Sequence, residues 1–235
     1  MAKKRSKEPL GRRLTVGEAV AGWLYLPLYL VGLSILLQKL FLVLHLPLNG
    51  ISINVTYFTV NLVFVLLAFH NFLRQSYFGG DFWNFVQALI LGFVLYYAGN
   101  FLITLAIEKL HGSLTVYNND TVLSLADQSY YVMLAATVLA APIVEETLLR
   151  GVVFGSLHST SRVLAYGMSC LIFVLMHNWQ YFAYYPAQEV LLSCLPYIPA
   201  AIALCWTYEK GRTIWASITL HALINAISFG VLTVS

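Results

Sequence analysis

The chain alternates long apolar stretches with short polar connections. A helix that crosses a lipid bilayer needs about 20 mainly apolar residues, and seven stretches meet that requirement. The pattern therefore predicts an all-α, polytopic membrane helix bundle with about seven transmembrane helices. The stretches lie at approximately 19–43, 55–73, 86–107, 129–157, 163–179, 186–207 and 213–233.

Two parts of this pattern are irregular. The fourth stretch is long and contains charged residues, so we expect a helix that is tilted, kinked or broken. The connection from Arg74 to Gln87 mixes aromatic and polar residues, which is typical of a membrane–water boundary. Two interpretations stay open there: a short amphipathic element on the cytoplasmic surface, or an aromatic belt around an ordinary turn.

The composition is that of a membrane protein. Hydrophobic residues make up 60% of the 235 residues and charged residues 10%, and the mean hydropathy is +0.76. A soluble domain is about half apolar and about a quarter charged. The chain therefore lacks the charge needed to cover a surface in water. This excludes a disordered segment, a solenoid and a soluble nucleic-acid-binding protein.

Basic residues are concentrated at the start of the chain, and they indicate its orientation. Six of the 13 Lys and Arg residues lie within the first 13 positions: Lys3, Lys4, Arg5, Lys7, Arg12 and Arg13. Cytoplasmic loops of membrane proteins carry an excess of Lys and Arg, so we expect a cytoplasmic N-terminus. The inner loops then hold Arg74, Arg162, Lys210 and Arg212, and the outer side holds Lys39 and Lys109.

Three polar clusters interrupt the apolar stretches in the second half of the chain. Ionisable residues at bilayer depth are costly and usually face the interior of a bundle, where they have a function. The clusters are Glu145 and Glu146 with Arg150, Phe173 with His177, and His221 with Asn225.

Helix geometry separates the two glutamates. Neighbouring positions of an α-helix point about 100° apart, so Glu145 and Glu146 cannot both face one partner squarely. Glu146 and Arg150 are four residues apart, with the acid first, which favours a structural ion pair. Glu145 has no local cation. It must meet a partner on another helix, take up a proton or contact water, and such a carboxylate suits general acid or base chemistry.

The depths of the candidate residues are compatible. At 1.5 Å per residue, Glu145 lies about 18 Å, His177 about 22 Å and His221 about 14 Å from the predicted cytoplasmic ends of their helices. A single histidine or asparagine in a membrane helix is more often an interhelical hydrogen-bonding residue than a catalyst. With Asn225 included, four such residues at matching depth favour a shared site.

At these residues the chain resembles the CPBP family, the CAAX-protease and bacteriocin-processing group also called Abi. The resemblance covers roughly Tyr130 to Phe229 and depends on three motifs in order, Glu-Glu-x-x-x-Arg, Phe-x-x-x-His and His-x-x-x-Asn. Here they are Glu145-Glu146-x-x-x-Arg150, Phe173-x-x-x-His177 and His221-x-x-x-Asn225. The first three apolar stretches carry no motif of this kind.

The resemblance implies a specific role for each residue of the site. The family includes the eukaryotic Ras-converting endopeptidase, which removes three residues after a prenylated cysteine. By this likeness Glu145 and His177 activate a water molecule for attack on a peptide carbonyl, and His221 and Asn225 stabilise the oxyanion. Glu146, Arg150 and Phe173 have supporting structural roles. The likeness also implies a cavity that opens to the cytoplasmic side.

The pattern and the resemblance together divide the chain into three regions, and the residue spacing predicts that no cofactor is needed. The regions are a basic cytoplasmic N-terminus (1–17), N-terminal transmembrane helices (18–128) and a CPBP-like catalytic transmembrane core (129–235). We expect metal-free glutamate chemistry, because the residues lack the His-Glu-x-x-His spacing and no Cys or Asp completes a compact site. Zinc bound by the histidines and glutamates is the alternative.

Three functions are compatible with these residues. The first is an intramembrane endopeptidase that cleaves membrane-associated peptides, lipidated proteins or protein C-termini. The second is a non-proteolytic protein of the same fold that regulates a sensor kinase or confers immunity to a bacteriocin. The third is a transporter with a proton relay, which the absence of visible internal repeats disfavours. We expect a bacterial plasma membrane protein, in contact with the lipid bilayer and with no nucleic-acid partner.

Overall fold

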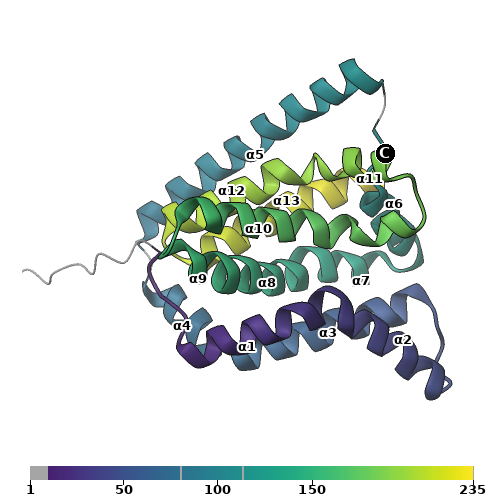
Figure 1. Ribbon diagram of the computed structural model, residues 1–235, viewed down its shortest axis with the longest axis horizontal. Helices are drawn as coiled ribbons and strands as arrows, with labels where there is room; N and C mark the ends of the chain where they lie inside the picture. The colour runs from purple at the N-terminus through teal and green to yellow at the C-terminus, as the bar shows by residue number, and fades with distance from the viewer. Residues whose placement is uncertain (1–9, 80, 113, 235) are drawn as a thin grey trace, which may run out of the picture.

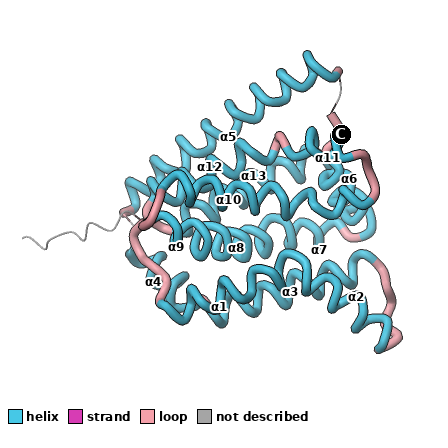
Figure 2. Tube along the Cα trace, in the orientation of Figure 1, coloured by secondary structure: helices cyan, strands magenta, loops and turns pink. Residues whose placement is uncertain are grey.

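The computed structural model describes residues 10–79, 81–112 and 114–234. Within these ranges the chain is helical and has no strand, which confirms the all-α prediction. Figures 1 and 2 show the helices side by side, with short connections at the two ends of the bundle. The α-helices are α1 (Val16–Pro27), α2 (Leu33–Val43), α3 (Gly50–Ala68), α4 (His70–Gly79), α5 (Phe82–His111), α6 (Tyr117–Gln128), α7 (Tyr130–Ala135), α8 (Ala141–Glu146), α9 (Gly155–His158), α10 (Arg162–Asn178), α11 (Ala187–Cys194), α12 (Tyr197–Gly211) and α13 (Ile214–Val234).

Within the described residues, seven helical spans are long and apolar enough to cross a membrane, as the sequence predicts. The second span begins earlier than expected because Asn49 caps it, accepting a hydrogen bond from the Ser52 N–H at 2.7 Å, and it ends at Ala68. The chain is an integral membrane protein. Its spans are Val16–Val43, Gly50–Ala68, Phe82–His111, Tyr130–His158, Arg162–Ala183, Ala187–Gly211 and Ile214–Val234.

Several spans are interrupted, and the interruptions lie close to the polar clusters. The fourth span has two π-helical segments, η2 (Ala136–Ala140) and η3 (Thr147–Phe154), on either side of α8. A third π-helical segment, η1 (Leu28–Gly32), directly follows Pro27, which has no N–H to donate. Such segments are rare and are frequent at functional sites. The fourth span is therefore broken, as expected, and it holds both glutamates between two irregular turns.

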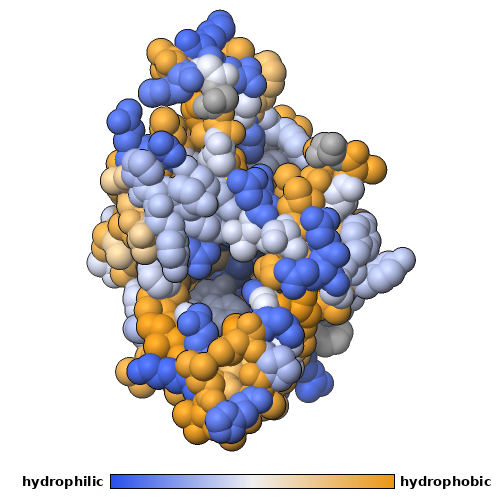
Figure 3. All heavy atoms as spheres, turned by 90° about the vertical axis from the view of Figure 1, so that its right-hand side faces the viewer, coloured by the Kyte–Doolittle hydropathy of each residue, from blue (hydrophilic) through white to orange (hydrophobic). Residues whose placement is uncertain are grey.

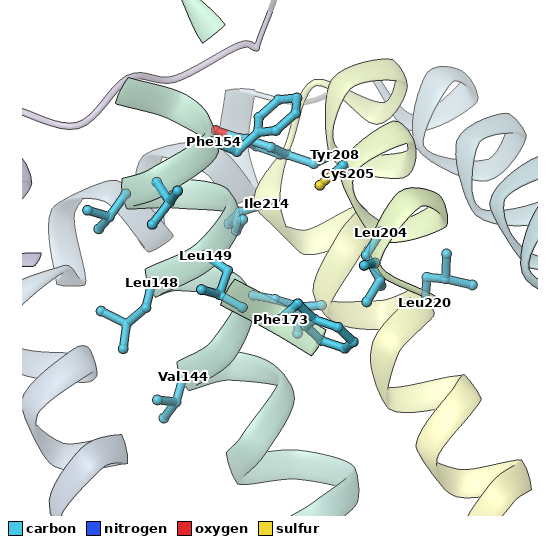
Figure 4. Packing of buried hydrophobic residues seen from close by; sticks show 14 of the residues in the cluster. Val144, Leu148, Leu149, Phe154, Phe173, Leu204, Cys205, Tyr208, Ile214 and Leu220 are labelled. Atoms are coloured by element: carbon cyan, nitrogen blue, oxygen red, sulfur yellow. The ribbon is translucent and has the colours of Figure 1, made fainter. Parts of the chain in front are cut away.

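The fourth span is also the centre of the core. Leu148, Leu149 and Phe154 on it are completely buried, and α10, α12 and α13 pack around it. Figure 4 shows these side chains meeting others from α10, α12 and α13. On the other side of the bundle α5 lies along α12, at Gly92, where an added Cβ would overlap the side chain of Thr207. This packing fixes the position of α8 between the neighbouring helices.

The segment that follows the second span is helical rather than an ordinary turn. Helix α4 packs against the start of α13, where the Thr213 hydroxyl donates to the Ser76 carbonyl at 2.9 Å. The Trp215 indole N–H donates to the Leu73 carbonyl, also at 2.9 Å. These contacts favour the interpretation of a short helical element, while its place on the cytoplasmic surface stays a prediction.

The two ends of the bundle differ in charge. The end at which α1 begins, on the left in Figure 1, carries Arg12, Arg13, Arg74, Arg162, Lys210 and Arg212. We call it the basic end. The opposite end, where α2, α5 and α13 finish, carries Lys39 and Lys109 with Glu108, Asp120, Asp127 and Glu189. The predicted orientation, with the basic end in the cytoplasm, stays a prediction, and Lys3, Lys4, Arg5 and Lys7 lie outside the described residues.

Candidate active site

Glu145 and the two membrane histidines come together in the interior of the bundle. Glu145 Oε2 lies 4.0 Å from His177 Nε2 on α10 and 3.9 Å from His221 Nε2 on α13. This oxygen is buried and has no hydrogen-bond partner within the described part of the chain. A buried polar atom of this kind requires an explanation, and a catalytic role or a bound water is the usual one.

The His177 ring is held in one orientation. Its Nδ1 lies 2.8 Å from the Phe173 carbonyl, and because a carbonyl can only accept, Nδ1 carries the hydrogen. The ring also stacks on Tyr197, with the centroids 4.7 Å apart. The Nε2 atom is left with a free lone pair on the side that faces Glu145.

Glu146 forms the expected ion pair and two contacts that the sequence did not indicate. Arg150 Nη1 donates to Glu146 Oε1 at 2.9 Å, and both side chains are completely buried. His221 Nδ1 approaches the same oxygen at 2.8 Å, and the Ser217 hydroxyl donates to Oε2. His221 therefore contacts both glutamates through different nitrogens. Ser217 could have been found from its position, four residues before His221 on one helix face.

Arg150 and Phe173 stabilise this arrangement through contacts with each other and with the backbone of α12. Arg150 Nη2 donates to the Ala201 carbonyl at 3.2 Å. The guanidinium lies 4.6 Å from the centroid of the Phe173 ring, a cation–π geometry that suits a charge without water around it. The three motifs thus meet in one cluster, in which Glu146 and Arg150 lie on the side of the two histidines that is nearer the basic end.

Asn225 lies beside the site but is already engaged. Its Nδ2 donates to the Thr137 carbonyl, in the first π-helical segment of the fourth span, at 2.8 Å. An amide nitrogen carries two hydrogens, so one remains for another acceptor. The residue also lines the cavity that reaches Glu145.

Two tyrosines outside the recognised motifs complete the surroundings of Glu145. Tyr29, in η1, lines the deep part of the cavity together with Glu145, near enough for the two side chains to interact electrostatically. Tyr57, on α3, donates to the backbone carbonyl of Tyr29 at 2.6 Å. Sequence reasoning missed both residues because a tyrosine in an apolar helix gives no signal that separates a site residue from a core residue.

A cavity of about 1010 Å³ connects these residues with one end of the molecule. Its deep part is lined by Tyr29, Glu145, His177, His221 and Asn225. Its outer part is lined by Glu108, Leu114, Asn118, Asn119 and Gln180, at the end opposite the basic end. Figure 3 looks onto this end and shows a hollow bordered by polar residues. The sequence predicted a cytoplasmic N-terminus, and the resemblance implied a cavity open to the cytoplasm. Because the cavity reaches the end opposite the basic end, where the N-terminal part of the chain lies, these two predictions cannot both be correct.

The spacing of the donors fits a water molecule better than zinc. Two ligands of a tetrahedral zinc ion lie about 3.3 Å apart when each is about 2.0 Å from the metal. The separations of 3.9 and 4.0 Å are larger and match a water about 2.8 Å from each atom. Among the described residues no group of three or more His, Cys, Asp or Glu side chains is arranged to hold a metal ion.

One comparison with known proteins identifies a family. No curated protein and no solved structure matches the chain. Residues 127–227 match the family model described as type II CAAX prenyl endopeptidase Rce1-like, and this segment contains all three motifs. Over residues 127–227 the chain is thus similar to the type II CAAX prenyl endopeptidases, as the three motifs predicted.

Proposed function

We propose that the protein is an intramembrane endopeptidase in which Glu145 and His177 activate a water molecule. The observation that carries the proposal is the buried Oε2 of Glu145, which has no hydrogen-bond partner among the described residues. This oxygen faces two histidine Nε2 atoms at distances that leave room for one water molecule. The cavity gives this position access to solvent. A base in this position can take a proton from a water molecule that both groups hold.

The residues supply each part of peptide hydrolysis. Glu145 takes a proton while the water oxygen bonds to the carbonyl carbon. His221 Nε2, and the free hydrogen of the Asn225 amide, are the groups nearest the negative charge that develops on the carbonyl oxygen. His221 Nδ1 donates to the Glu146 carboxylate, so Nε2 carries a hydrogen when the His221 ring is protonated, and Glu146 balances the positive charge of that imidazolium. The C–N bond then breaks, and the proton held by Glu145 passes to the leaving amine.

The proposal extends to the setting of the reaction. The substrate is a peptide or a lipidated protein beside the lipid bilayer, and the membrane is a bacterial plasma membrane. Residues 129–235 form the catalytic part, and residues 18–128 contribute Tyr29 and Tyr57 to it. A sensor kinase or a bacteriocin system is the kind of partner that the alternative, non-proteolytic function would require.

A comparison of membrane peptides tests this function. In membranes from cells with the His177→Ala protein, we expect precursor peptides to accumulate and their products to disappear, because Glu145 loses the group that holds its water. Mass spectrometry of the peptides checks this result. His158→Ala is the matched control, since His158 pairs with Glu209 near the basic end at 3.3 Å. If the peptide pools are identical in membranes with the parent, the His177→Ala and the His158→Ala proteins, and the cellular phenotype is preserved, the result favours the non-proteolytic regulator.

Removal of metal is expected to leave cleavage unchanged. The purified protein, treated with a strong chelator and then dialysed, should keep its kcat, because the proposed nucleophile is a water held by Glu145 and His177. Peptide cleavage before and after treatment measures this. Loss of cleavage on chelation, with recovery on addition of zinc, would show that the zinc alternative is correct.

Tyr29→Phe is expected to lower kcat about tenfold and to change KM little. A hydrogen bond to a charged group contributes about 1.5–3 kcal/mol, and the Tyr29 hydroxyl positions the Glu145 carboxylate without contacting the substrate. Tyr25→Phe is the control, because the Tyr25 hydroxyl donates to Asn61 Oδ1 at 2.8 Å instead. Steady-state kinetics compares the two variants, and equal kcat values would rule out the positioning role of Tyr29.

A further inference from the structure

The cavity leaves the bundle along a polar stripe on α5. Tyr96, Asn100, Thr104 and Glu108 recur every four residues on this helix, and all four line the cavity. Asn100 Nδ2 donates to the Tyr96 hydroxyl, and the Thr104 hydroxyl donates to Asn100 Oδ1, both at 3.2 Å. Residues at this spacing share one face of a helix. The stripe therefore forms a polar path from the depth of the site to the end opposite the basic end.

The way towards the basic end is closed by packed side chains. Beneath Glu145 lie the buried pair Glu146 and Arg150, followed by Leu149, Val153 and Phe154, all completely buried. Figure 4 shows Leu149 and Phe154 within the layer of apolar side chains that also includes Tyr208 and Ile214. The cavity lining includes none of these closing residues. Solvent and substrate therefore do not reach Glu145 from the basic end, whereas the cavity connects Glu145 with the opposite end.

The charges of the two ends indicate which side of the membrane this route faces. The basic end gathers six Lys and Arg residues among the described ones, with four more in the sequence before Leu10. At the opposite end Lys39 and Lys109 are outnumbered by Glu108, Asp120, Asp127 and Glu189. An excess of Lys and Arg marks the cytoplasmic side. The mouth of the cavity therefore lies on the other side.

We infer that the active-site cavity opens to the extracytoplasmic side, and that its substrate is a peptide segment that has already crossed the membrane. This inference rests on the proposed function. The cavity lining contains the Glu108 carboxylate at its outer part and no Lys or Arg among the described residues. A free C-terminal carboxylate would find no cation there. The fitting substrate is an extended segment of neutral or basic character, cleaved at an internal bond.

The side of the mouth can be measured without any proteolysis. Thr115, next to the mouth, and Ser159, at the basic end, are both exposed. In intact cells a membrane-impermeant maleimide should label Thr115→Cys but label Ser159→Cys only after permeabilisation. The parent protein, with its own Cys170, Cys194 and Cys205 in membrane spans, gives the background. The reverse labelling pattern would overturn the inference whatever the activity of the protein.

Sealed membrane vesicles test the access of substrate. The probe is a pool of internally quenched peptides that carry sulfonates, so that they cannot cross the bilayer. Right-side-out vesicles should cleave the pool at least tenfold faster than inverted vesicles, and detergent should abolish the difference. Faster cleavage by inverted vesicles would contradict the inference but leave the proposed function intact. Absence of cleavage even in detergent would contradict the proposed function, and the labelling would still decide the side.

Discussion

Glu145→Gln is expected to reduce kcat for peptide cleavage by about 10³-fold or more and to leave the fold intact. Glutamine has the same shape as glutamate but cannot take a proton from water. The change breaks no bond at Oε2, because this atom has no protein partner among the described residues. Steady-state kinetics and thermal unfolding of the purified protein in detergent measure the two effects separately.

The matched control for this variant is Glu108→Gln. Glu108 is an exposed glutamate at the outer part of the same cavity, so the change removes an equal charge far from the histidines. Its kcat should stay close to that of the parent. A Glu145→Gln protein that unfolds at the parent's temperature and cleaves at the parent's rate would show that Glu145 is not the base.

The sequence predicted much of the architecture because the bilayer sets the length of each span. The pair of Glu146 and Arg150 was also predictable, since it depends on local helix spacing alone. The meeting of Glu145 with His177 and His221 followed from depth, which regular helices convert directly into position along the membrane normal. Each of these predictions uses quantities that can be counted along one helix at a time, namely residue spacing and depth.

Properties that depend on several helices were not predictable. An angle of 100° per residue assumes a regular α-helix, whereas the fourth span contains π-helical turns on both sides of Glu145 and Glu146. His221 can therefore contact both glutamates, which the regular helix did not indicate. The contribution of Tyr29 depends on how the first span packs, and no local pattern encodes that. The position of the cavity mouth likewise follows from the divergence of α5 from the bundle (Figure 1).

Glu146→Gln is expected to destabilise the folded protein by about 3–5 kcal/mol. Arg150 is completely buried, and Glu146 is the carboxylate that balances its charge. The neutral amide would leave the guanidinium in an apolar interior, where its neighbours among the described residues include the Ala201 carbonyl, the Phe173 ring and Cys205 but no carboxylate that balances its charge directly. Urea unfolding in detergent, followed by tryptophan fluorescence, measures the loss. Glu108→Gln is the control, because Glu108 is an exposed glutamate, and changes of exposed side chains usually alter stability by about 0.5 kcal/mol or less.

A double variant separates charge balance from chemistry at the same position. Glu146→Gln with Arg150→Met removes both charges, so it should recover most of the stability that the single change loses. Cleavage should remain low in the double variant, because His221 Nδ1 has then lost the carboxylate that orients its ring. If the double variant is as unstable as the single one, the buried arginine is not the cause of the loss. If Glu146→Gln alone keeps the parent's stability and loses only activity, Glu146 acts through His221 and has no structural role.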